Sequence, residues 1–170
     1  GHEWCLNTLH PDGTVDRISG TEGLPMANVT HLRAGSQRGE LWVGTTAGVA
    51  FRRAPDAARA PLERRWRYFG GDAWLPGDDT VHSLAVTSAE ETWVATRCGA
   101  ALLRSTTMTL DDKAAKLLTR VPSLTRHLLV AAANLKSYGN TSTASIAQHD
   151  GDNDGLWTVM FVASQSFRFA

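Results

Sequence analysis

Short apolar runs separated by turn residues fill the first hundred residues of the chain. The runs are five or six residues long and rich in Val, Leu, Trp and Thr, side chains that suit a buried pleated surface. Glycines at 48 and 99 fall where a hairpin turn needs a positive φ or the absence of a Cβ atom. The pattern predicts strands at 29–34, 41–45, 49–53, 81–86, 92–96 and 100–104.

These strands belong to an internal repeat. Residues 41–51 (LWVGTTAGVAF) match residues 92–102 (TWVATRCGAAL) at an offset of 51, and Leu24-Pro25 returns as Leu75-Pro76 at the same offset. Further matches are 15 with 66, 18 with 69 and 20 with 71 at an offset of 51, and 29 with 81 and 32 with 84 at 52. A period of about 50 residues is typical of stacked supersecondary units.

Two more features complete the repeat unit. Residues 66–69 form a predicted outer strand, which follows a Pro- and Ala-rich loop at 54–62. At the start of the chain, residues 4–6 and 14–18 form a predicted hairpin across His10-Pro11-Asp12-Gly13, where Pro presets φ and Gly closes the turn. The expected fold class is therefore mainly β: residues 1–104 form part of a β-propeller, with two four-stranded blades and a hairpin of a preceding blade. A partial array leaves both end faces open, so we expect other blades or other chains to cover them, and the isolated chain to unfold with poor cooperativity.

The repeat also resembles a known family. Gly23-Leu24-Pro25, then Val29 and Leu32, then residues 39–45 (GELWVGT) and Gly48 are similar to the two-component regulator propeller repeat. The second copy departs from it at Thr92 and Ala95, and at Asp78-Asp79. The resemblance covers about 60% of the chain. It implies an extracytoplasmic protein that senses ligands.

The hydrophobic pattern changes after Arg104. Thr109 with Asp111 and Asp112 predicts a helix start, and the apolar positions 110, 114, 117 and 118 share one helical face up to a stop at Val121-Pro122. The pattern leaves the type of element at 126–135 open, predicts a long loop at 137–155, and predicts a helix at 156–169 that is apolar nearly all round. Residues 105–170 are thus expected to open a helical domain that continues elsewhere. They resemble the helical domain that follows such propellers in some large exported proteins, which implies an α/α toroid of the kind found in carbohydrate-active enzymes.

Charge narrows the range of partners. Seventeen Lys and Arg residues balance seventeen Asp and Glu residues. This balance argues against nucleic acid as the main partner, which would need a concentrated basic surface. No apolar run approaches the length that spans a bilayer. The two cysteines, Cys5 and Cys98, form no disulfide framework and no zinc motif.

One segment carries candidate metal chemistry. Asp150, Asp152 and Asp154, with Gly155 after them, fit the first half of a calcium loop, in which alternate acids converge on one cation. Phe161 stands at the twelfth position, where a bidentate acid belongs, so this is not a complete EF-hand. Three interpretations stay open: a partial Ca²⁺ site completed by distant ligands, a helix cap at Asp154 with solvated neighbours, or catalytic acids at the mouth of a toroid.

The remaining residues favour binding over catalysis. Trp42 and Trp93 recur at equivalent positions, which indicates packing between units, and His31 and His82 are offset by one residue, which disfavours a shared metal. Propeller ligands bind where loops converge, so the expected ligand loops are 20–28 with 71–80 at one rim and 35–39 with 88–91 at the other. We expect a binding module of an exported or cell-surface protein, with a glycan or small molecule as ligand. The alternatives are a substrate platform for a carbohydrate-active enzyme and a structural subunit of a large assembly.

Overall fold

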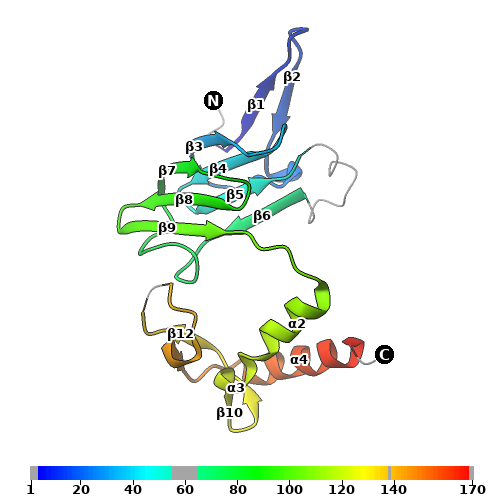
Figure 1. The fold of residues 1–170 in the computed structure, drawn as a ribbon, viewed down its shortest axis with the longest axis vertical. Helices are drawn as coiled ribbons and strands as arrows, with labels where there is room; N and C mark the ends of the chain where they lie inside the picture. Colours follow the sequence, from blue (N-terminus) through cyan, green and yellow to red (C-terminus); the bar gives the residue numbers. More distant parts are fainter. Residues whose placement is uncertain (1–3, 55–64, 138, 169–170) are drawn as a thin grey trace. The chain divides into compact units, whose positions relative to one another are not determined.

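The chain divides into two units, Gly1–Thr106 and Thr107–Ala170, in a computed structural model that describes residues 4–54, 65–137 and 139–168. Figure 1 shows strands throughout the first unit and helices with short strands in the second. Most of the predicted loop at 54–62 lies outside the described residues.

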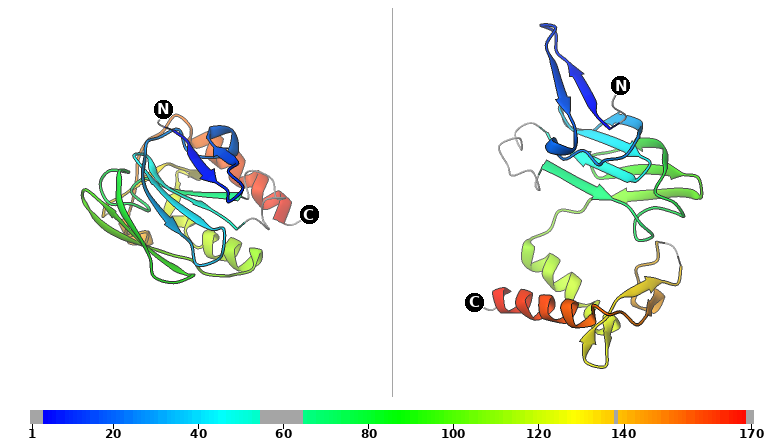
Figure 2. Two further views of the ribbon diagram at one scale, coloured as in Figure 1. Left: turned by 90° about the horizontal axis from the view of Figure 1, so that it is seen from above. Right: turned by 180° about the vertical axis from the view of Figure 1, so that it is seen from behind.

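Unit one is built from antiparallel strands, and the fold of the chain is mainly β, as expected (Figures 1 and 2). The strands predicted from the repeat are confirmed to within one residue at either end. The first strand lies further along the chain than predicted, at 6–9 rather than 4–6. In chain order the strands are β1 (Leu6–Leu9), β2 (Val15–Ile18), β3 (Val29–Ala34), β4 (Leu41–Thr45), β5 (Gly48–Arg52), β6 (Trp66–Phe69), β7 (Val81–Val86), β8 (Glu91–Thr96) and β9 (Gly99–Arg104).

The strands form three sheets in which chain neighbours are also spatial neighbours. The hairpin β1-β2 is one sheet, β3-β4-β5-β6 is a four-stranded sheet, and β7-β8-β9 is a three-stranded sheet. The expectation of two four-stranded units is wrong for the second of them. After Arg104 the chain runs to the Thr109 cap and into a helix, so no described strand follows β9 along its free edge.

The two larger sheets have the same register. Trp42 lies opposite Phe51 and Arg33, and Trp93 lies opposite Leu102 and Ala85. Each sheet also has a register shift at the start of its first strand, after Val29 in β3 and after Val81 in β7. Gly48 has φ +103°, as its place in the hairpin turn requires, and a Cβ there would collide with the carbonyl oxygen of Phe69. The sequence repeat is therefore a repeat of strand pairing as well.

Two hydrophobic clusters hold unit one together. The first lies between the two larger sheets, and the second lies between the four-stranded sheet and the segment that carries β1, β2 and Leu24. The first consists of Trp42, Val49, Leu75, Val81, Leu84, Val94, Ala101 and Leu103. The second consists of Ile18, Leu24, Val43, Ala50 and Trp66. Alternation along β4 explains the division, because Trp42 and Val43 point to opposite faces of the same sheet.

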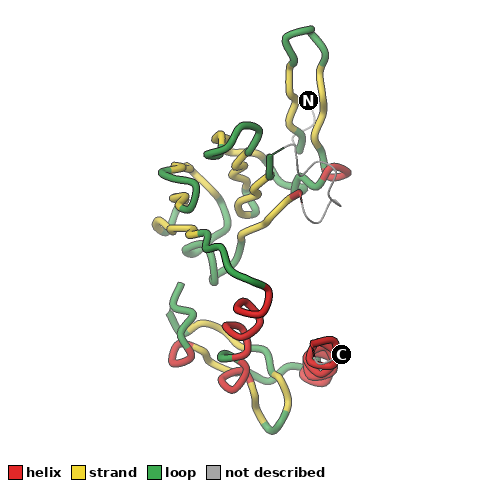
Figure 3. Tube along the Cα trace, turned by 45° about the vertical axis from the view of Figure 1, so that its right-hand side comes forward, coloured by secondary structure: helices red, strands yellow, loops and turns green. Residues whose placement is uncertain are grey.

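Unit two mixes helices with short strand pairs (Figure 3). The first helix, α2 (Leu110–Leu118), is confirmed: the Thr109 hydroxyl accepts a hydrogen bond from the N–H of Asp112, as the sequence predicts. The other elements are α3 (Val121–Leu124), β10 (Thr125–Arg126), β11 (Leu129–Val130), β12 (Ala133–Leu135), η3 (Thr143–Ser145), β13 (Ile146–Gln148) and α4 (Asp154–Arg168).

The prediction of a long loop at 137–155 is wrong in part. Strand β13 lies inside that range and pairs with β12, with Ala133 opposite Gln148. The strand has only three residues and no clear alternation, so its pairing partner, rather than its own pattern, defines it.

Helix α4 exposes much of its apolar surface in unit two. Leu156, Val159, Met160 and Val162 are each more than half exposed, and Phe167 is 86% exposed. The predicted helix at 156–169 is thus confirmed over its described part, but the described residues of unit two do not bury it. No described helix combines the length and the apolar character that crossing a membrane requires.

Candidate functional site

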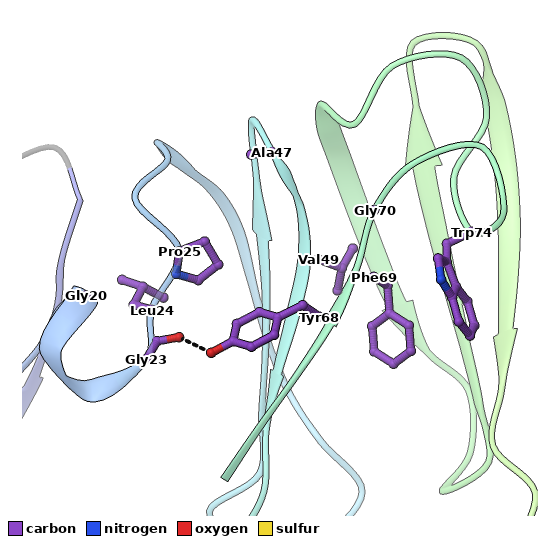
Figure 4. Close-up of a pocket in the computed structure, with 10 residues that line it drawn as sticks. All are labelled: Gly20, Gly23, Leu24, Pro25, Ala47, Val49, Tyr68, Phe69, Gly70 and Trp74. Carbon is purple, nitrogen blue, oxygen red and sulfur yellow. Dashed lines mark hydrogen bonds between the residues drawn. The ribbon is translucent and has the colours of Figure 1, made fainter. Parts of the chain in front are cut away.

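A pocket of about 450 Å³ opens at one rim of unit one, where the turns at the ends of the strands gather (Figure 4). Its wall combines the two loops predicted for ligand binding with the ends of β5 and β6. The lining residues are Gly20, Gly23, Leu24, Pro25, Ala47, Val49, Tyr68, Phe69, Gly70 and Trp74. The volume falls in the range of small-molecule sites, about 300–1,000 Å³.

Hydrogen bonds from β6 fix one wall of this pocket. The indole N–H of Trp66 donates to the carbonyl oxygen of Glu22 at 2.6 Å, and the Tyr68 hydroxyl donates to the carbonyl oxygen of Gly23 at 2.6 Å. Figure 4 shows Tyr68 pointing across the pocket toward Gly23. Gly23 has φ +93°, and a Cβ there would meet the Trp66 ring, so only glycine fits this approach of loop to strand.

The short helix η1 (Gly20–Glu22) gives this wall its shape. The Glu22 carboxylate accepts hydrogen bonds from the Thr21 hydroxyl, the Ser19 hydroxyl and the Ser19 N–H, at 2.7–2.8 Å. These bonds, with that from Thr21 as the largest contribution, lower the pKa of Glu22 to about 2. The carboxylate is therefore ionised throughout the physiological pH range, and its negative charge is used in hydrogen bonds within the loop.

The opposite wall is aromatic. Phe69 and Trp74 meet edge to face with ring centroids 5.1 Å apart, and Trp74 is 48% exposed. The loop that carries Trp74 is anchored by Asp79, whose side chain accepts a hydrogen bond from the N–H of Gly71 at 2.6 Å and whose carbonyl oxygen accepts one from the N–H of Gly48 at 2.8 Å. Partial burial raises the pKa of Tyr68, so its hydroxyl stays protonated at physiological pH and remains a donor.

The lining suits an uncharged, amphipathic ligand. Aromatic faces of Tyr68 and Trp74 offer flat apolar contact, while the backbone of the glycines and the tyrosine oxygen offer hydrogen bonds.

Sequence reasoning located the loops at 20–28 and 71–80, and the structure brings both to this pocket. It missed Ala47, Val49, Tyr68, Phe69 and Gly70. Tyr68, which neighbours the repeated position of Phe69, could have been found by tracing which side chains point toward the rim. At the other rim, the loops at 35–39 and 88–91 are closed by their own hydrogen bonds, such as Gln37 N–H to Glu40.

The predicted cation site lies in unit two, where Arg126 occupies its centre. The guanidinium group of Arg126 pairs with the Asp150 carboxylate, and it also pairs with Asp154 at 3.0 Å. Asp154 is the first residue of α4 and is 7% exposed, whereas Asp152 is exposed and points to no described partner. The structure thus brings two of the three acids together, around an arginine side chain.

A Ca²⁺ ion would need these carboxylates to leave Arg126. One observation fits a ligand role: the Oδ1 atom of Asp154 is buried and has no hydrogen-bond partner. Among the described residues, no three His, Cys, Asp or Glu side chains gather closely enough to hold one metal ion. The calcium site stays a prediction. Asp154 is the first residue of α4, so its negative charge lies at the helix N-terminus, but its carboxylate binds Arg126 and accepts no described backbone N–H, so it is not a helix cap.

The remaining candidate residues from the sequence are two histidines on inner strands and the two cysteines. His31 lies on β3 and its buried Nε2 atom has no hydrogen-bond partner; a Cβ on the neighbouring Gly44 would meet both His31 and Val81. His82 is exposed on β7. Neither Cys5 nor Cys98 forms a disulfide.

Comparison with protein-family models, with curated proteins and with solved structures found no match for this chain. Its function must therefore be argued from its own residues.

Proposed function

We propose that unit one consists of consecutive blades of a β-propeller similar to the two-component regulator repeat, and that the chain is a ligand-binding module of an exported or cell-surface protein. Its ligand is a glycan or another small polyhydroxylated molecule, held in the pocket of Tyr68 and Trp74. The observation that carries the proposal is the pocket itself, which lies where two repeats meet and combines exposed aromatic rings with backbone hydrogen-bonding groups.

The blade arrangement is supported by the two hydrophobic clusters, which are built from equivalent residues. Leu24, Val43 and Ala50 in the second cluster correspond to Leu75, Val94 and Ala101 in the first, each at an offset of 51. Each sheet therefore packs one face on the unit before it and offers the other face to the unit after it. Radial repetition of this contact is how propeller blades pack.

The last sheet offers such a face without a cover among the described residues. Trp42 is 8% exposed beneath β7-β8-β9, whereas its counterpart Trp93 is 45% exposed. Beside Trp93, Ala85 and Ala100 are exposed and Leu102 is partly exposed. We expect this face to be covered by a further blade or by another chain of an assembly. The same open face is the observation that favours the second candidate function, a structural subunit.

Binding to an immobilised glycan array, followed by calorimetry with each hit, tests the ligand. Trp74→Ala removes one of the two exposed rings of the pocket, and we expect it to weaken binding by about tenfold or more, the range for loss of an aromatic contact of about 1.5 kcal/mol. Trp93→Ala removes a ring of similar exposure outside the pocket and is the matched control.

The proposal requires that the two variants differ. Binding lost in Trp74→Ala and kept in Trp93→Ala supports the pocket. Equal binding by both variants and the wild type would show that the ligand binds outside this pocket. If the protein binds no glycan at all, the structural role becomes the better proposal.

A further inference from the structure

A second pocket, of about 370 Å³, shares Gly20 with the first. Its other lining residues are Trp4, Arg17, Ser19, Thr21 and Met26. The two pockets therefore lie on the same loop, at Gly20.

The strand register shows that three lining residues of the second pocket stand at positions equivalent to lining residues of the first. Leu6 of β1 pairs with Ile18 of β2, as Val49 of β5 pairs with Phe69 of β6. Trp4 stands two residues before Leu6, as Ala47 stands two residues before Val49. By the same correspondence, Arg17 takes the place of Tyr68, and Ser19 takes the place of Gly70.

The exchanges change the chemistry of the pocket. In place of Ala47 there is the indole of Trp4, which is 47% exposed and held by a hydrogen bond from its Nε1 to Asn28 at 3.0 Å. In place of the Tyr68 phenol there is the guanidinium group of Arg17. An aromatic plane with a guanidinium group beside it fits a ring that carries a carboxylate, because the planar fork of arginine can bind both carboxylate oxygens.

The acids near Arg17 are already engaged. Asp16 lies on the opposite face of β2 and pairs with His10 at 2.8 Å. The carboxylate of Glu22 is bound by Ser19 and Thr21. No described acid lies within ion-pair distance of Arg17, so its charge is available to a ligand.

We propose that this second pocket binds an acidic sugar residue, and that the ligand of unit one is an acidic glycan whose neighbouring residue occupies the pocket of Tyr68 and Trp74. The inference rests on the proposed glycan-binding function and narrows its ligand to uronic-acid-containing chains.

The test compares each acidic glycan with its own neutral form. The probes are tetrasaccharides of hyaluronan and heparosan, in which acidic and neutral sugars alternate, each beside its carboxyl-reduced counterpart, titrated calorimetrically into the full chain. We expect at least one acidic probe to bind about tenfold or more tightly than its reduced form, the factor for one charge-assisted hydrogen bond. We expect the preference to shrink as salt is raised, because the arginine is exposed.

Three variants locate the preference. Arg17→Gln should abolish it while leaving the affinity for the reduced probe unchanged, and Arg17→Lys should restore part of it. Arg38→Gln removes an equally exposed arginine from a distant loop and should change nothing.

The outcomes separate this inference from the proposed function. Equal binding of acidic and reduced probes, with loss of both in Trp74→Ala, overturns the acidic pocket and keeps the glycan site. A preference for the acidic probe that survives in Arg17→Gln also overturns it. If neither form of any probe binds, the acidic pocket is overturned, while the glycan site is decided separately by the glycan array and the Trp74→Ala variant.

Discussion

Replacing the two equivalent tryptophans gives a direct measure of how the repeats pack. Trp42→Ala and Trp93→Ala remove the same side chain from the same register position of successive sheets. Trp42 stacks on Phe51 and Phe69, with ring centroids 4.5 Å and 5.9 Å away, inside the cluster between the sheets. Trp93 stands on the open face of the last sheet.

The expected difference follows from burial. A Trp side chain has about 200 Å² of surface. At 8% exposure Trp42 buries about 180 Å², which at about 25 cal/mol per Å² contributes about 4–5 kcal/mol. At 45% exposure Trp93 buries about 110 Å², which contributes about 3 kcal/mol on the same scale. The unfolded chain also buries part of each side chain, so unfolding measures the difference between the two, and ring stacking adds about 1 kcal/mol for Trp42. Trp42→Ala should therefore cost about 2–3 kcal/mol more than Trp93→Ala.

Urea unfolding followed by far-UV circular dichroism measures this difference, with hydrogen exchange of the β4-β5 and β8-β9 amides as a local readout. Trp42→Ala should lower the protection of both sheets, because its ring lies between them, and Trp93→Ala should leave β4-β5 protected. Equal costs, or a larger cost for Trp93→Ala, would show that the face of Trp93 is covered in solution and would refute the reasoning from exposure.

Three further predictions concern charged groups. Arg126→Met should destabilise the start of α4 by about 2 kcal/mol, because it leaves the buried Asp154 carboxylate unpaired. Hydrogen exchange of the amides in the first turn of α4 measures this loss of stability. The control variant Asp152→Asn changes an exposed residue and should leave the exchange of these amides unchanged. Glu22→Gln should destabilise unit one at neutral pH but not near pH 2. The folded pKa of Glu22, about 2, lies below the unfolded value, so its contribution is complete above about pH 4.5 and is lost as the pH falls toward 2; unfolding curves of both proteins across this range would disagree with the prediction if their difference stayed constant. Calorimetric titration with Ca²⁺ should release heat from the wild type and not from Asp152→Asn/Asp154→Asn, and equal heats would rule out a cation held by these acids.

The sequence by itself determined the positions of the strands in the two larger sheets of unit one. The strand positions follow from apolar runs of similar length. Because the two repeats match at an offset of 51, a strand assigned in one repeat can be tested against the other, and Trp42 and Trp93 could be placed at equivalent positions from the sequence alone. The start of α2 was equally accessible, because the cap at Thr109 is a local hydrogen bond between residues three apart. These features depend on interactions between residues that are close in the chain, so the sequence alone is enough to predict them.

Only the tertiary structure showed that residues at equivalent positions of the repeat have different surroundings. Trp42 and Trp93 have the same pattern around them, yet Trp42 is covered by a following sheet, whereas no sheet in the described part of the chain covers Trp93. The pairing of Arg126 with Asp150 and Asp154 also joins residues 24 and 28 positions apart. In the same way, Tyr68 meets Gly23 across 45 residues to form the pocket. Long-range contacts of this kind depend on how whole elements pack, and packing is settled by the sum of many weak contacts rather than by any local pattern.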